Sequence, residues 1–319
     1  MKPKEAVALI ESSYRLDLST EDWLEQIAAN ASSALGCSQG AMAFRYDVSS
    51  GDWVQPEPPV LHHVSQEFAS EFFNQPGLPR EATVALVRAF MSIRFHSSRA
   101  IFEGIGIGAH MGALFDRHGI DDLIGINGLD ASGRGCIVTV VARKRAYSPR
   151  TLHLWHRLAA HISAGNRLRT SLAELGNTAT DPTGISEAIL TPTGKVEHAT
   201  GPAEPRSARE ALRDALVRIE KARAERDDAN RSVDLWRALV AGRWSLVEHF
   251  ERDGRRYFLA QKNDPELTQD RRLTRLERQV LAHAELGHSN KLIAYELGLS
   301  VSTVSSHLGR AHKKIGTGI

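Results

Sequence analysis

The sequence predicts an α+β N-terminal domain, a small α+β middle module and an all-α C-terminal domain. Over residues 1–172, hairpins of β-branched and aromatic residues alternate with amphipathic helices, which is typical of an antiparallel sheet with helices. Residues 173–262 hold two further hairpins around a charged helix, and residues 263–319 hold three short helices without strands. A length of 319 residues is compatible with two or three domains.

The first elements are predicted from helix-capping residues and from the composition of strands. Ser19 precedes an acidic first turn, and Gly36 stands where the same helix should end. The next expected elements are a strand at 40–46, a turn at 49–52, a return strand from Trp53, and helices at 64–73 and 80–91.

Residues 122–142 predict a long hairpin, and its second strand is strongly β-branched. Ser148 and Pro149 form a typical helix start, and the helix should reach about Leu172. Residues 97–119 contain five glycines without the strand, helix and lysine of a nucleotide-binding loop. They favour either a flexible wall over a cavity or tight backbone packing.

The middle module is predicted to contain hairpins at 188–198 and 242–261, the second with an Asp253-Gly254 turn. Between them, a long charged helix is expected from about Ala208 to Arg231. Its apolar residues recur at steps of four and three, which fits a short coiled coil or a helix packed on the neighbouring strands. Residues 176–184 have the composition of a linker, and 262–272 form a tether.

Composition excludes several classes of function. No apolar run approaches the roughly 20 residues that cross a bilayer, and Glu5 and Glu11 interrupt the N-terminal stretch, so neither a membrane partner nor a signal peptide is expected. Cys37 and Cys136 lack metal or redox spacing, which indicates two buried, reduced thiols in a cytoplasmic protein.

No catalytic or metal-binding constellation is predicted. His153 and His156 are neighbours on one helix, but no carboxylate completes a ligand set. No serine or cysteine nucleophile carries a local signature. We therefore expect no cofactor, no metal and no enzymatic activity.

The C-terminal stretch from Leu273 to Gly316 contains several helix-capping signals close together. Thr274 and Glu277 form a capping box, and Gly287 stands where a left-handed cap is expected. Ser289 and Ser300 can cap a second and a third helix. The Gly-containing turn between these two helices is typical of a helix-turn-helix.

The third helix has two faces. Its apolar stripe is Val304, Leu308, Ala311 and Ile315, and the opposite face carries Ser302, Ser306, Arg310 and Lys313. A helix in a DNA major groove needs short side chains close to the bases and cations near the phosphates. Residues 271–319 contain eight Lys or Arg and three Asp or Glu, which gives a net charge of +5. The whole chain has a net charge of +2, so residues 1–270 have a net charge of −3.

These residues resemble the LuxR-type helix-turn-helix of bacterial transcription regulators. The matching residues are Leu273, Thr274, Glu277, Val280, Leu281, Gly287, Ser289, Asn290, Lys291, Ile293, Ala294, Leu297, Ser300, Thr303, Val304, His307 and Gly316. The resemblance implies sequence-specific binding of double-stranded DNA by the helix at about 301–315, in a homodimer that has RNA polymerase among its expected partners. By the same resemblance, Ser289, Lys291 and Thr303 hold the DNA backbone, while Ser305, Ser306 and Gly309 take the base-facing positions.

The sequence departs from this family at three positions. Leu276 and Ser305 stand where the family usually has a cation, and Gly309 has no side chain that could reach a base. Arg310 is then the candidate for a bidentate contact with guanine. The sequence ends at Ile319, where the family continues into a pairing helix, so we expect dimerisation through residues 1–250. His307 is expected to be a packed core histidine.

The stretch from Gly135 to Ile162 resembles the end of a GAF-type sensor domain, and residues 173–262 suggest a PAS-like module. This implies that the upstream domains sense an unknown small molecule or protein. A platform for dimerisation and protein interaction without a ligand would fit the same pattern, and a cavity-sized void would argue against it. The C-terminal helices could also form a three-helix bundle that binds protein, or a DNA-binding tail fused to an enzyme. A phosphorelay receiver is disfavoured because the hairpins are antiparallel.

Overall fold

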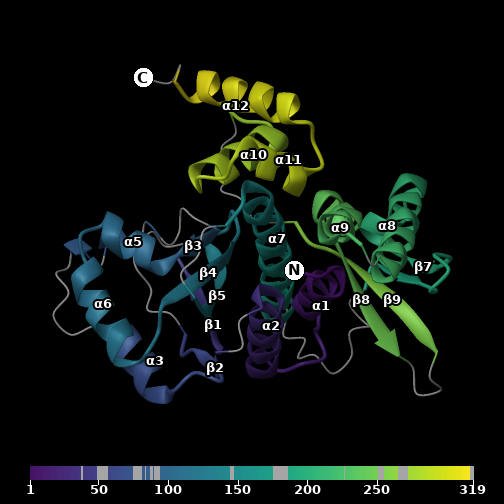
Figure 1. Ribbon diagram of the computed structural model, residues 1–319. Helices are drawn as coiled ribbons and strands as arrows, with labels where there is room; N and C mark the ends of the chain where they lie inside the picture. The colour runs from purple at the N-terminus through teal and green to yellow at the C-terminus, as the bar shows by residue number, and fades with distance from the viewer. Residues whose placement is uncertain are drawn as a thin grey trace.

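The structure is a computed structural model that describes residues 1–36, 39–48, 57–74, 81–82, 84–86, 89, 94–143, 147–174, 186–225, 227–250, 255–264 and 272–316. Within this part the chain forms two antiparallel sheets with helices, followed by a set of three C-terminal helices (Figure 1). The predicted order of an α+β upstream part and a helical C-terminal part is therefore confirmed.

The first sheet has five strands in the order β2-β1-β5-β4-β3. The strands are β1 (Ala41–Asp47), β2 (Val60–His62), β3 (Phe95–Ser97), β4 (Asp122–Leu129) and β5 (Arg134–Ala142). The predicted hairpin of β4 and β5 is confirmed, with a register that runs from Asp122 opposite Ala142 to Leu129 opposite Gly135. β4 is buried along its whole length, because helices cover both faces of the sheet.

The two faces of this sheet carry different helices (Figure 1). One face packs against α2 (Thr20–Leu35) and α7 (Pro149–Glu174), and the other against α3 (Gln66–Phe73), α5 (Ser98–Gly104) and α6 (Gly108–Arg117). The helix α1 (Pro3–Ser13) packs against α2 and α7. The predicted caps of α2 are confirmed: Ser19 Oγ accepts from the Asp22 amide at 3.1 Å, and Gly36 has a φ of +69°. The helix α1 was not predicted.

The second sheet has four strands in the order β7-β6-β9-β8. It consists of β6 (Ala188–Leu190), β7 (Val196–Ala199), β8 (Trp244–Phe250) and β9 (Arg256–Lys262). Both predicted hairpins are therefore present, and β6 pairs with β9 to join them. A short 3-10 turn, η2 (Gly201–Ala203), follows β7.

The single helix predicted over 208–231 is wrong, because the chain forms α8 (Arg206–Ala224) and α9 (Ala229–Gly242) instead. Glu225 has extended backbone angles, and the Asp228 side chain starts α9 by accepting from the Asn230 amide at 2.9 Å. Leu212 and Ile219 are buried in a core shared with α1 and α7. The packed-helix alternative is thus the one that the structure supports.

The expectation of a flexible wall at residues 97–119 is also wrong. This stretch forms α5 and α6, and Phe102 and Phe115 pack on the sheet. Gly106 makes the connection with a φ of +80°. A Cβ on Gly108 would lie 3.1 Å from the Glu103 side chain, so tight backbone packing is the better description.

Some predicted elements fall outside the described residues. These are the turn at 49–52, the strand from Trp53, the linker at 176–184, the turn at 253–254, part of the helix at 80–91 and most of the tether. None of the helices in the described part has the length and hydrophobicity that a bilayer crossing requires.

Candidate nucleic-acid interface

The C-terminal helices begin and end at the predicted residues. They are α10 (Arg275–Glu285), α11 (Asn290–Leu297) and α12 (Val301–Gly316). In the capping box, Thr274 Oγ1 accepts from the Glu277 amide at 3.3 Å, and Glu277 Oε2 accepts from the Thr274 amide at 2.8 Å. Ser289 and Ser300 accept from the amides of Leu292 and Thr303, and so cap α11 and α12.

The apolar stripe of α12 faces α10 and α11. Val304 is fully buried with Val280 and Ile293, and Ala311 is buried with Leu273 and Leu281. This packing holds α12 by one side only, so that its other side remains at the surface.

That other side is exposed, and α12 is the outermost helix of the molecule, with α10 and α11 between it and the rest (Figure 1). The exposed predicted contacts are Ser289, Lys291, Ser302, Ser305, Ser306, Arg310 and Lys313; Thr303 is half-buried. Asn290 Nδ2 donates to Ser305 Oγ at 3.0 Å, which ties the first turn of α11 to α12. The predicted DNA-contacting residues are therefore exposed except for Thr303, and their contact with DNA stays a prediction.

His307 does not lie in the core as expected. It is half-buried, and its Nδ1 lies 3.0 Å from Nη2 of Arg310, one helical turn away. The Arg310 side chain is exposed on α12, and its Nε lies 4.0 Å from Oε1 of Glu277.

Lys314 lies off this surface and has a structural contact. Its Nζ is 2.6 Å from Oε2 of Glu277, so the end of α12 is joined to the start of α10. This hydrogen bond, together with the one from the Thr274 amide, lowers the pKa of Glu277 to about 2. The Glu277 carboxylate is therefore ionised at neutral pH and pairs with Lys314 across the two helices.

The opposite side of the three-helix set is docked on the upstream part through α11. The Tyr295 hydroxyl donates to the Val233 carbonyl of α9 at 3.1 Å, and it lies 3.1 Å from Nε2 of His161 on α7. Nδ1 of His161 lies 3.0 Å from the Tyr14 hydroxyl of α1. Since the carbonyl can only accept, Tyr295 must accept from His161 Nε2–H, and Tyr14 must donate to Nδ1. Every member of this buried relay is then satisfied.

A second docking contact is a buried ionic cluster. Arg94 Nη2 lies 2.9 Å from Oε1 of Glu296, and both side chains are almost fully buried. His283 Nδ1 lies 2.8 Å from Oε2 of Glu296, and His288 Nδ1 lies 3.4 Å from it. Arg94, His283 and His288 together hold the pKa of Glu296 well below its usual value despite its burial. The carboxylate is therefore ionised at neutral pH and joins three segments of the chain.

The ligand atoms of His283, His288 and Glu296 converge as they would around a metal ion. A tetrahedral zinc ion with bonds of 2.0–2.1 Å needs ligand atoms about 3.3 Å apart. However, Arg94 Nε donates to His288 Nε2 at 2.9 Å, so neutral His288 carries its proton on Nδ1, the atom that would bind the metal. The arginine also supplies the positive charge that Glu296 needs, and this arrangement does not fit a metal.

Sequence reasoning missed these docking residues. Arg94 lies 194 positions from His288, and Tyr14 lies 147 positions from His161, so no local pattern connects them. Tyr295 and Glu296 are buried on α11 although they lie outside the core that Ile293, Ala294 and Leu297 form with α10 and α12, and no sequence pattern indicated this. Cys136 is buried, as expected, and its burial raises the pKa of the thiol to about 12; Cys37 lies outside the described residues.

Comparison with known families supports the same region. Residues 271–318 match the family model GerE, described as bacterial regulatory proteins of the luxR family. The comparisons with curated proteins and with solved structures found no match. The matched family and the exposed basic helix together support a DNA-binding transcriptional regulator.

Proposed function

We propose that this protein is a bacterial, cytoplasmic transcription regulator that binds double-stranded DNA through α12 and responds to a signal taken up by its upstream part. The observation that carries the proposal is the exposed face of α12, where small hydroxyls stand at the helix start and Arg310 and Lys313 follow. Free amides at the starts of α11 and α12 add donors for phosphate oxygens.

In this proposal, the residues divide by role. Ser289, Lys291 and Thr303 contact the DNA backbone, as do Ser302 and Lys313, while the base edges are read by Ser305, Ser306 and Arg310. Serine can bond to any base edge, so specificity arises from two copies of the helix held in a homodimer, with RNA polymerase as a further partner. The divisions 1–172 (GAF-like sensor), 173–262 (PAS-like module) and 263–319 (DNA-binding domain) are part of the same proposal.

The alternative is a DNA-binding protein whose upstream part is only a platform for pairing and protein contacts. A cavity of about 360 Å³ between α1, α2 and the second sheet supports ligand sensing over this alternative. No catalytic role is proposed.

The DNA-binding role is tested by salt titration. Binding of full-length protein to a labelled duplex should fall steeply with salt, because several phosphate contacts release counterions. Arg310→Ala and Lys313→Ala should each weaken binding and reduce the salt slope by about one unit. Arg206→Ala is the control, because this arginine is 86% exposed on α8 and pairs with Glu210. Equal affinity of all variants across the salt series would place the DNA elsewhere.

A further inference from the structure

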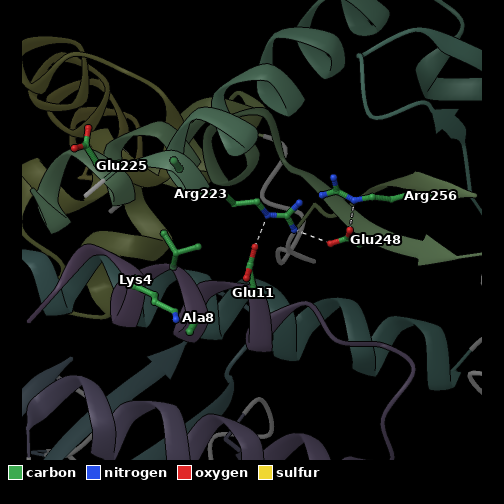
Figure 2. Close-up of a pocket in the computed structure, with 9 residues that line it drawn as sticks. Lys4, Ala8, Glu11, Arg223, Glu225, Glu248 and Arg256 are labelled. Atoms are coloured by element: carbon green, nitrogen blue, oxygen red, sulfur yellow. Dashed lines mark hydrogen bonds and ion pairs between the residues drawn. The ribbon is translucent and has the colours of Figure 1, made fainter. Parts of the chain in front are cut away.

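The arginines that line the hollow beside α1 and α8 are paired with carboxylates. In this hollow of about 760 Å³, Arg223 lies between Glu11 of α1 and Glu248 of β8, at 2.5 and 2.7 Å, and Arg256 also pairs with Glu248 (Figure 2). Cations that are already neutralised offer little attraction to a phosphate. The polar groups that can recognise DNA are therefore sought on α11 and α12.

Ser305 of α12 is hydrogen-bonded to another helix. Asn290, the first residue of α11, donates from Nδ2 to Ser305 Oγ at 3.0 Å. By contrast, the hydroxyls of Ser302 and Thr303 lie 2.8 and 2.7 Å from Oγ of Ser300, within the cap of α12. Ser305 is exposed and Asn290 is half-buried, so this bond lies at the edge of the surface that is proposed to face DNA.

The space beside Ser305 is open. Gly309 lies one turn further along α12, and a Cβ on it would meet nothing within 4 Å. A base edge can therefore come close to the helix backbone here, which a long side chain at either position would prevent. The serine side chain is short and needs such an approach to form a hydrogen bond of about 2.7–2.8 Å.

The bond from Asn290 restricts what Ser305 can recognise. A serine hydroxyl has one proton to donate and two lone pairs. Asn290 occupies one lone pair, and a hydroxyl that accepts a hydrogen bond becomes a stronger donor in turn. The free amides at the start of α11 favour an acceptor on the helix side, which agrees with Nδ2 of Asn290 facing Ser305. Ser305 is thus available to DNA chiefly as a donor.

The major-groove edges of the four bases differ in what they offer to a donor. Guanine presents two acceptors, N7 and O6, and no donor, whereas cytosine presents only the donor N4. Adenine and thymine each present one acceptor. A serine hydroxyl that acts as a donor is therefore matched best by guanine and worst by cytosine.

We propose that Asn290 is a positioning residue that makes Ser305 read guanine. The Asn290 amide donates to Ser305 Oγ, and the Ser305 hydroxyl donates to N7 or O6 of the base. The inference rests on the proposed DNA-binding function and gives the identity of one base in the bound site. The ability of serine to bond to any base edge is removed at this position.

The test begins with the motif that full-length protein selects from a randomised duplex pool. Ser305→Ala identifies the base pair that Ser305 contacts, and affinity is then measured for duplexes that carry each of the four bases there. The wild type should prefer guanine over cytosine about fivefold, the equivalent of one hydrogen bond of about 1 kcal/mol. Asn290→Leu, which has no donor, should reduce this preference to less than about twofold, because the hydroxyl is then free to accept as well.

Asn290→Asp is a second variant, and it should reverse the preference. Its carboxylate accepts from the Ser305 hydroxyl, so Ser305 offers its lone pairs to cytosine or adenine, which present amino donors. A merely structural role of Asn290 would not produce this reversal. Lys291→Leu is the control, because this exposed neighbour on α11 should weaken binding to all four duplexes equally.

A wild-type preference for cytosine, or the same guanine preference in both Asn290 variants, would overturn the inference. Each preference is a ratio of affinities for one variant, so a loss of folded protein lowers all four affinities and leaves the ratio unchanged. A selected motif that neither Ser305→Ala nor the Asn290 variants alter rejects the positioning role alone. No selected motif with the wild type rejects the proposed function itself.

Discussion

Three helices meet at His161: α1 and α7 of the upstream part and α11 of the C-terminal part. It lies on α7, faces Tyr14 of α1 and Tyr295 of α11, and is fully buried. The charges of Arg157 and Glu296 act on its pKa in opposite directions. Burial, and then Arg157, lower the pKa of His161 to about 3, so its ring is neutral and the direction of the relay is fixed.

The buried histidines predict a loss of stability in mild acid. The pKa of His288 is also lowered, to about 4, by burial and by Arg94. In the unfolded chain these rings take up protons near pH 6.5, so below that pH the unfolded state binds more protons. Stability is therefore greatest above about pH 6.5 and falls toward pH 4, by about 1.4 kcal/mol per pH unit for each histidine.

Urea unfolding at pH 7.5 and 5.5 measures this slope. His288→Gln should reduce the difference in unfolding free energy between the two pH values by about 1.4 kcal/mol, because mainly the pH unit below 6.5 contributes. His312→Gln, at an exposed residue of α12, should leave the difference unchanged. Equal stability of the wild type at the two pH values would contradict the burial of neutral rings.

At the scale of elements, capping and periodicity could be predicted because they are local. Thr274, Ser289 and Ser300 lie within three residues of the amides they cap, so the sequence contains the whole interaction. The break between α8 and α9 was missed, because the heptad spacing continues through Glu225 and Asp228 although the backbone does not. The helices α5 and α6 were not predicted, because the five glycines of residues 97–119 argue against helices although apolar residues recur there.

The contact between the end of α11 and α9 can be tested at Gly298. It ends α11 with a φ of +67°, and a Cβ there would lie 2.8 Å from Cβ of Ala241 in α9. Gly298→Ala should therefore destabilise the protein by about 1–3 kcal/mol through backbone strain, with a further cost from the clash. Gly309→Ala is the matched control, because a Cβ on this residue of α12 meets nothing within 4 Å. It should stabilise the protein by about 0.5–1 kcal/mol, and equal effects of both changes in urea unfolding would rule out the close approach.

At the scale of the molecule, α11 joins the DNA-binding helices to the upstream core. Tyr295 belongs to the same buried cluster as α1, α7 and α9, and Arg237 of α9 donates to the carbonyls of Ala294 and Leu299. None of this could be predicted, because it depends on partners more than 50 residues apart. The exposed face of α12 could be predicted, because it needs only helix periodicity.

Arg94→Leu should undock the helices. It leaves Glu296 buried without its cation, which costs about 3–5 kcal/mol. Small-angle X-ray scattering should show a larger radius of gyration, and the urea midpoint should fall. Arg150→Leu is the control: its pair with Asp228 is largely exposed, so its loss should cost less than about 1 kcal/mol. An unchanged radius and midpoint for Arg94→Leu would show that the cluster does not hold the docked state.

We expect α12 to read the DNA sequence. The most direct measurement is selection from a randomised duplex pool by full-length protein, followed by sequencing of the bound fraction. We predict enrichment of one motif with two related half-sites, and its loss in the double variant Ser306→Ala, Arg310→Ala. The same motif enriched equally by the variant, or no enrichment by the wild type, would contradict the claim.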